Sequence, residues 1–374
     1  MTKKLFAVFI TCLALLALTG CKDQNLIENL TLSLVIGMDL NEQNEFEVSI
    51  SSPVFNKEAK DKEEEFQVTS TTLRKSRDEF DKVVLGSTAG GKAELILVGK
   101  KLMRHPGWAT ILDALYRDPK NTVTPRLVMV DGPVYDIIRL SPKDKPRLPL
   151  YLMKVIDMAY VRNVTVRTTL QQFYRHHKEK GMTSAITEIG LKGRDIQILG
   201  TALLDDREKY KLTISSTETK LLNMMKQPGK GAFPLTLQLP EFKSSLRFLP
   251  TNQLSFNTFS VKTRKKARYD RGKFRFDVNI KMAIFLTERL FPIDMRKETR
   301  ALERYIESEL ERQFADFIRK IQAAKIDPVG FGMYARAYAY PQWKKVEDDW
   351  GEEFADAEVN VKVDVEIQGM GAMK

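Results

Sequence analysis

Alternation of apolar and polar residues is most regular in the last third of the chain. From Phe274 to Leu286 every second residue is apolar, which predicts a long strand with one buried face. Residues 298–324 carry apolar side chains at spacings of three and four, which predicts a long helix that ends before Asp327-Pro328. Val359 to Ile367 alternate again. Together these patterns predict a curved antiparallel sheet packed on one long helix.

The earlier part of the chain mixes both periodicities. Alternation from Phe46 to Ile50 follows a polar turn and predicts a hairpin. Strand-like runs at 94–99 and 127–130 are interleaved with helical spacing at 76–85 and 108–116. Such interleaving favours an α/β or α+β first domain. We therefore predict an α+β protein of three mixed α/β domains.

The chain has 374 residues, more than one hydrophobic core usually holds. Domain boundaries are placed near 195, where a new strand pattern starts, and near 255, after the turn-rich residues 227–231. The predicted organisation is a signal peptide at 1–20, a lipidated tether at 21–29, an N-terminal α/β domain at 30–195, a middle α/β domain at 196–255 and a C-terminal α+β domain at 256–374.

The first residues have the layout of an export signal. Lys3 and Lys4 precede an apolar run from Leu5 to Leu18, which is too short to span a bilayer but fits the apolar region of a signal peptide. The run closes with Leu18-Thr19-Gly20-Cys21, which has the form of a lipobox and predicts lipidation of Cys21. The alternative is an ordinary signal peptide with a cysteine near its cleavage site.

The cysteine content and the net charge narrow the range of possible functions further. Of the two cysteines, Cys12 lies in the leader and Cys21 would carry lipid, so the mature chain has no thiol for a disulfide, a nucleophile or a zinc site. The net charge of +11 would suggest nucleic acid in a cytosolic protein. On an exported, lipid-anchored chain it favours an anionic membrane surface instead, and no nucleic acid is expected.

One segment has the spacing of a phosphate-binding loop. Gly86 to Lys92 matches the glycines and the lysine of that motif, but Ala93 replaces the hydroxyl residue that would hold Mg²⁺. Residues 94–98 also indicate a strand, whereas the motif needs a helix whose N-terminus meets the phosphates. A flexible Gly-rich turn is the preferred interpretation.

The remaining candidates for chemistry are weak. Adjacent His176 and His177 would point about 100° apart on a helix, so they are interpreted as polar surface. The acidic run at 347–353 lacks the spacing of a calcium loop. The basic cluster from Lys262 to Arg268 is either a solvated β-turn or a contact for lipid phosphate or an acidic partner. No catalytic set emerges, so we predict a non-enzyme without metal or cofactor.

With these motifs in place, the chain resembles the C-subunit lipoproteins of spore germinant receptors, the Ger(x)C or GerAC-like family. The resemblance covers nearly the whole length and is most specific in the closing segment. It rests on the following residues, in order: Cys21, Asp23, Glu28, Leu34 to Asp39, Leu95 to Leu102, Tyr116 to Asp118, Gly200 to Ala202, Glu218-Thr219, Asp327 to Gly332, Tyr340 to Val346 and Asp349 to Phe354. Lys22 stands where the family usually has Trp, which replaces an aromatic group beside the lipid by a charge.

The resemblance implies three mixed domains, no catalysis, and assembly with two integral membrane subunits, of A type and B type, in a nutrient germinant receptor. The expected location is the outer face of the spore inner membrane, with Cys21 as the lipid acceptor and Asp23 as a residue for sorting or retention. Phe331, Trp343, Trp350 and Tyr340 are expected to pack in the core or in turns. The alternatives are a solute-binding lipoprotein of a transporter and, more remotely, an exported hydrolase.

Overall fold

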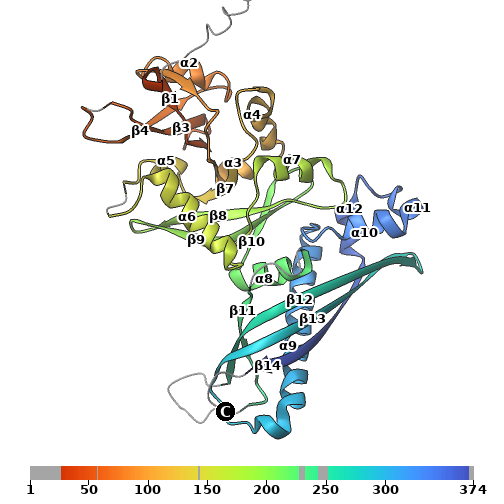
Figure 1. Ribbon diagram of the computed structural model, residues 1–374. Helices are drawn as coiled ribbons and strands as arrows, with labels where there is room; N and C mark the ends of the chain where they lie inside the picture. Colours follow the sequence, from red (N-terminus) through yellow and green to blue (C-terminus); the bar gives the residue numbers. More distant parts are fainter. Residues whose placement is uncertain (1–26, 57, 142–143, 227–231, 243–251, 370–374) are drawn as a thin grey trace, which may run out of the picture.

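The protein is built around two large sheets placed at opposite ends of the molecule (Figure 1). The computed structural model describes residues 27–56, 58–141, 144–226, 232–242 and 252–369. In this part of the chain an eight-stranded sheet is formed by residues up to 214, and a four-stranded sheet by residues 234–369.

The first unit opens with a short helical turn and carries a sheet with strand order β10-β9-β8-β7-β6-β2-β3-β4. Its strands are β1 (Leu30–Leu32), β2 (Val35–Leu40), β3 (Phe46–Pro53), β4 (Glu63–Thr69), β5 (Ser87–Ala89), β6 (Leu95–Gly99), β7 (Arg126–Asp131), β8 (Ala185–Lys192), β9 (Asp195–Leu204) and β10 (Tyr210–Ile214). Its helices are η1 (Ile27–Asn29), α2 (Ser76–Phe80), α3 (Lys100–Met103), η2 (Trp108–Leu112), α4 (Asp113–Arg117), α5 (Val134–Ile138), α6 (Leu148–Val161) and α7 (Leu170–Lys178).

The middle strands β2, β6, β7 and β8 run parallel, and both faces of the sheet are covered. One face buries Trp108 and Phe173 of η2 and α7. The other buries Ile137 of α5 and Leu152 of α6. Burial on both faces explains why β6 and β7 are almost continuously apolar in sequence.

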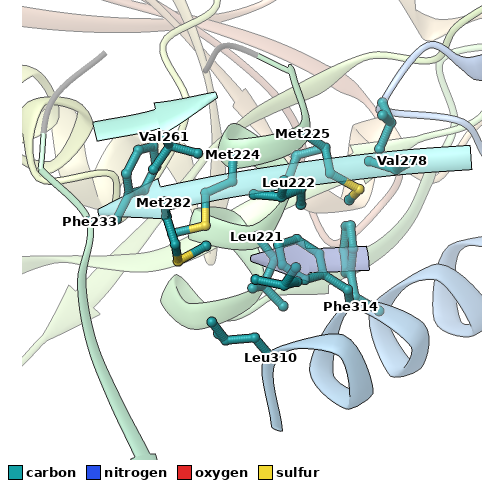
Figure 2. Packing of buried hydrophobic residues seen from close by; sticks show 14 of the residues in the cluster. Leu221, Leu222, Met224, Met225, Phe233, Val261, Val278, Met282, Leu310 and Phe314 are labelled. Atoms are coloured by element: carbon teal, nitrogen blue, oxygen red, sulfur yellow. The ribbon is translucent and has the colours of Figure 1, made fainter. Parts of the chain in front are cut away.

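The second unit packs one long helix on a twisted sheet. Its elements are α8 (Ser216–Lys226), β11 (Pro234–Gln238), β12 (Gln253–Asp270), β13 (Lys273–Arg289), α9 (Met295–Ala323), α10 (Phe331–Tyr338), α11 (Tyr340–Trp343), α12 (Trp350–Ala355) and β14 (Glu358–Gly369). The apolar side of β13 and the stripe on α9 bury each other, and α8 adds Leu222 and Met224 to the same cluster (Figure 2). Side chains such as Met282, Leu310 and Phe314 make up this core.

The predicted α+β class and the sheet packed on one long helix are confirmed. The direction of the last strand differs from the expectation: β11, β12 and β13 are antiparallel, but β14 pairs parallel with β13. The reason is topological, because α9 carries the chain back along the sheet before β14 begins, which makes a strand-helix-strand crossover.

Helix α9 also covers the outer edge of β14 with its own carboxylates. The backbone N–H groups of Val363, Val365 and Ile367 point away from β13, and each donates to a glutamate oxygen at 2.9 Å. The acceptors are Glu311, Glu307 and Glu303, spaced by four along one face of the helix.

The domain boundaries expected from the sequence can be placed on this topology. Residue 195 is the first residue of β9, which pairs with β8 in the first sheet. The segment 196–255 contributes β9 and β10 to the first sheet and β11 and the start of β12 to the second. In the described residues, no helix combines the length and apolar character needed to cross a bilayer.

Candidate functional site

The residues expected to carry the lipid anchor, Cys21 and Asp23, lie outside the described residues. The next family-like segment is strand β2. Near its end, the side chain of Asp39 binds the first residue of a helix. The Asp39 carboxylate accepts the N–H of Leu40 at 2.8 Å and that of Val134, the first residue of α5, at 3.0 Å. Burial raises the pKa of Asp39 above its usual value, and the two N–H donors oppose this.

The phosphate-loop candidate does not have the geometry of a nucleotide site. Its Ser87–Ala89 forms β5 beside β1, and the chain then enters strand β6 without passing through a helix N-terminus. The segment is therefore not the flexible turn expected throughout: Ser87–Ala89 form a strand, and a turn follows at residues 91–92.

Charged groups at the carboxyl ends of β6 and β7 and within β8 are paired with one another. The ammonium of Lys100 lies 3.0 Å from Asp131 and 3.0 Å from Glu188, whose side chain is buried. Among the described residues, no three His, Cys, Asp or Glu side chains are grouped so that they could hold a metal ion.

The closing family segment folds around one buried carboxylate, Asp327. This side chain accepts the backbone N–H of Gly330 at 2.7 Å, that of Gly332 at 2.9 Å and the indole N–H of Trp350 at 2.9 Å. Gly330 has a φ of 82°, which a residue with a side chain adopts only with strain. Burial raises the pKa of Asp327, although its three N–H donors favour the charged form. Asp327 thus closes the turn that contains the two glycines and also binds Trp350, which is 23 residues further along the chain.

The aromatic residues of this segment fall into two groups. Phe331, Trp343 and Trp350 are buried, as expected for core residues. Tyr340 is 54% exposed and lies outside the core.

The Asp327 turn joins the two units of the protein. The backbone carbonyl of Asp327 accepts the N–H of Thr183, just before β8, at 2.9 Å. Gly181 and Gly332 are in backbone contact, since a Cβ on Gly332 would lie 2.6 Å from the Cα of Gly181. Arg336 of α10 binds Glu179 through two hydrogen bonds of 2.8 and 2.9 Å. We call this contact region the junction.

A cavity of about 650 Å³ lies beside the junction. Its walls come from α7, α8, β12 and α10, and they include Arg175, His176, Lys226, Lys265 and Tyr334. The histidine was expected on a polar helix surface; instead His176 is half-buried in this wall, while its neighbour His177 is exposed and bonds to Glu208.

The basic cluster from Lys262 to Arg268 is part of strand β12 and not a β-turn. Because strand side chains alternate, Lys262, Arg264, Lys266 and Arg268 are exposed on the outer face, whereas Lys265 reaches the cavity. This division could not be read from the residue types, since strand periodicity is hidden where both faces carry lysine or arginine.

Comparison with known proteins identifies the family. The profile described as "Spore germination B3/ GerAC like, C-terminal" matches residues 199–371, and "Spore germination protein N-terminal domain" matches 23–191. Spore germination protein B3 of Bacillus subtilis (strain 168) is 23% identical over 376 residues, covering 96% of both chains. Spore germination protein GerQC of Bacillus cereus is 19% identical over 363 residues, covering 95% of this chain and 96% of that protein.

A solved structure shares the fold. The crystal structure of the GerBC protein matches with a TM-score of 0.55 at 19% identity, covering 89% of this chain and 96% of that one. The resemblance inferred from the sequence is therefore confirmed over both halves. The chain belongs to the GerAC-like family of spore germination proteins.

Proposed function

We propose that this protein is the lipid-anchored, non-catalytic C subunit of a nutrient germinant receptor. It assembles with integral membrane subunits of A type and B type at the outer face of the spore inner membrane. The observation that carries the proposal is the match of the family profiles to both halves of the chain, together with the lipobox cysteine Cys21 that follows the expected leader.

The anchor would set the orientation of the molecule. Ile27, the first described residue, follows Cys21 by so few residues that an extended chain keeps it within about 20 Å of the lipid. Apolar side chains are exposed at this end: Ile27 is 47% exposed, Val83 57% and Leu85 99%. The segments that carry them are adjacent, because the backbone of Gly86 abuts that of Asn29. Such a patch suits a bilayer surface.

If the anchored end meets the bilayer, the basic face of β12 is expected to bind something other than the bilayer. Strands β1 and β12 lie in opposite halves of the molecule (Figure 1), and Lys262, Arg264 and Lys266 are exposed on β12. We assign them to an acidic surface of another receptor subunit rather than to lipid headgroups.

The test is germination of spores carrying Cys21→Ala, compared with a deletion of the gene and with Cys12→Ala. The second substitution removes a cysteine of the leader but leaves the lipobox intact. We expect the Cys21 variant and the deletion to lose the response to one nutrient and to keep the response to a nutrient-independent trigger. The Cys12 variant should respond normally.

Normal nutrient responses in the deletion strain, after related receptors have also been deleted, would refute the proposal. A solute-binding lipoprotein would then become the preferred alternative. It is not favoured by the fold, because such proteins usually have two similar lobes, and the two sheets here differ in strand order and direction.

A further inference from the structure

The cavity beside the junction carries an excess of positive charge. Its lining contains Arg175 from α7, Lys226 from α8 and Lys265 from β12. Among the residues that the structure describes, none of these three groups lies within 4.0 Å of a carboxylate oxygen. Two cations of the surrounding surface, Lys180 and Arg336, do have such partners, at 2.9 and 2.8 Å. Arg167, a fourth cation of the lining, lies 3.9 Å from Asp157. Arg175, Lys226 and Lys265 therefore differ from the other cations in and around the cavity by having no such partner.

Lys265 is held by neutral groups. Its ammonium donates to the carbonyl of Met225 at 2.9 Å and lies 4.7 Å from the ring centre of Tyr334. A carbonyl and an aromatic face attract a cation, but neither carries a net negative charge. The direct partners of the ammonium are therefore neutral.

The acidic groups close to the cavity are already engaged. Glu179 lines it, but its two carboxylate oxygens accept from Arg336. Asp327 acts on Lys226 and Lys265 electrostatically, yet its oxygens are taken by the N–H donors of its own turn. The three cations therefore have no direct ion pair with these acidic groups, and Asp327 acts on the two lysines only at longer range.

One further polar atom in the wall lacks a partner. The Nδ1 atom of His176 is buried and has no hydrogen bond among the described residues. Burial and the neighbouring Lys226 and Arg175 lower the pKa of His176 to about 3, so the ring is neutral at pH 7. Buried polar atoms are normally hydrogen-bonded, and an orphan in a cavity wall often marks a missing ligand or water.

Burial also lowers the pKa of Lys226 and Lys265, each to about 8. Keeping two ammonium groups charged in this buried part of the cavity wall is unfavourable unless an anion binds to them. The cavity volume of about 650 Å³ lies in the range of small-molecule sites. Val166, Met182 and Val329 provide apolar wall beside the charges.

We propose that this cavity binds a small organic anion, with its carboxylate or phosphate group between Lys226, Lys265 and Arg175 and its apolar part against the remaining wall. The proposal goes beyond the function proposed above and does not depend on the lipid anchor or on other subunits, because every residue it uses belongs to the described part of this chain.

The test is calorimetric titration of the mature chain carrying Cys21→Ser, with phenyl phosphate, benzoate and the neutral benzyl alcohol as probes. We expect saturable binding of one phenyl phosphate per chain, weaker binding of benzoate and none of benzyl alcohol. Lys226→Met and Lys265→Met should each weaken phenyl phosphate binding at least tenfold. Lys266→Met is the matched control, because it removes the same charge from the adjacent position on the exposed face. This variant should bind phenyl phosphate with the affinity of the parent chain.

Arg175→Gln provides a second variant at an exposed position should a lysine variant fail to fold. The proposal is overturned if neither anion binds saturably up to millimolar concentration. It is equally overturned if folded variants at Lys226, Lys265 and Arg175 bind as well as the parent chain, or if Lys266→Met weakens binding as much as they do.

Discussion

Replacing Lys226 by methionine measures what the ammonium group at the junction costs in stability. Methionine keeps a long unbranched side chain but removes the charge. The pKa of Lys226 falls from 10.5 to about 8 on folding, and one unit corresponds to about 1.4 kcal/mol. The upper limit is therefore about 3.5 kcal/mol. Because the side chain is only half-buried and solvent screens its charge, we expect the variant to be more stable by about 1–2 kcal/mol at pH 7.

The pH dependence has a definite sign. The pKa is depressed in the folded protein, so the folded state holds fewer protons than the unfolded state between pH 8 and 10.5. Parent stability should rise with pH over this window, and the advantage of the variant should shrink. The charged groups facing Lys226 are Lys265, Arg175 and Asp327, of which Lys265 contributes a similar slope of its own.

The assay is urea unfolding of the parent, Lys226→Met and the control Lys266→Met at pH 7 and pH 9.5. The control should match the parent at both values. A Lys226 variant that is less stable than the parent at pH 7, or whose difference from the parent is the same at both pH values, would refute the reasoning.

Three further substitutions probe the junction by the same unfolding assay. Asp327→Ala removes the acceptor of three buried N–H donors and should cost about 3–5 kcal/mol; a loss below about 1 kcal/mol would contradict the role given to this carboxylate. Gly332→Ala should cost about 2–3 kcal/mol through the backbone contact at the junction, whereas Gly90→Ala, which meets only a side-chain tip at 3.0 Å, should cost much less; equal losses would refute the packing argument. Arg336→Met breaks the pair with Glu179 and should cost about 0.5–1 kcal/mol, less at high salt; a loss independent of salt would show that packing rather than charge is responsible.

Sequence patterns predicted those elements whose periodicity reflects one buried face. The alternation in β13 and the stripe on α9 are of this kind, and both were correctly expected. The direction of β14 was missed, because alternation identifies a strand but carries no information about the direction of its neighbour.

The junction could not be derived from periodicity at all. Its contacts join residues far apart in the chain: Glu179 and Arg336 are separated by 157 positions. Asp327 and the glycines after it were recognised only as a family-like block, and their shared role became visible once the turn was seen to hold one carboxylate. Lys265 was hidden among neighbouring lysines and arginines, since only the fold decides which of them turns inward.

The glutamates that α9 directs at β14 have a consequence for how copies of this protein behave when crowded together. An outer strand normally presents free N–H groups on which a strand from another molecule can dock, which is a common route to aggregation. Here the N–H groups of Val363, Val365 and Ile367 are already occupied by carboxylates. An incoming strand would have to displace three charge-assisted hydrogen bonds and approach a row of negative charges. Over Val363 to Ile367, this side of the second sheet is therefore closed to growth by strand addition.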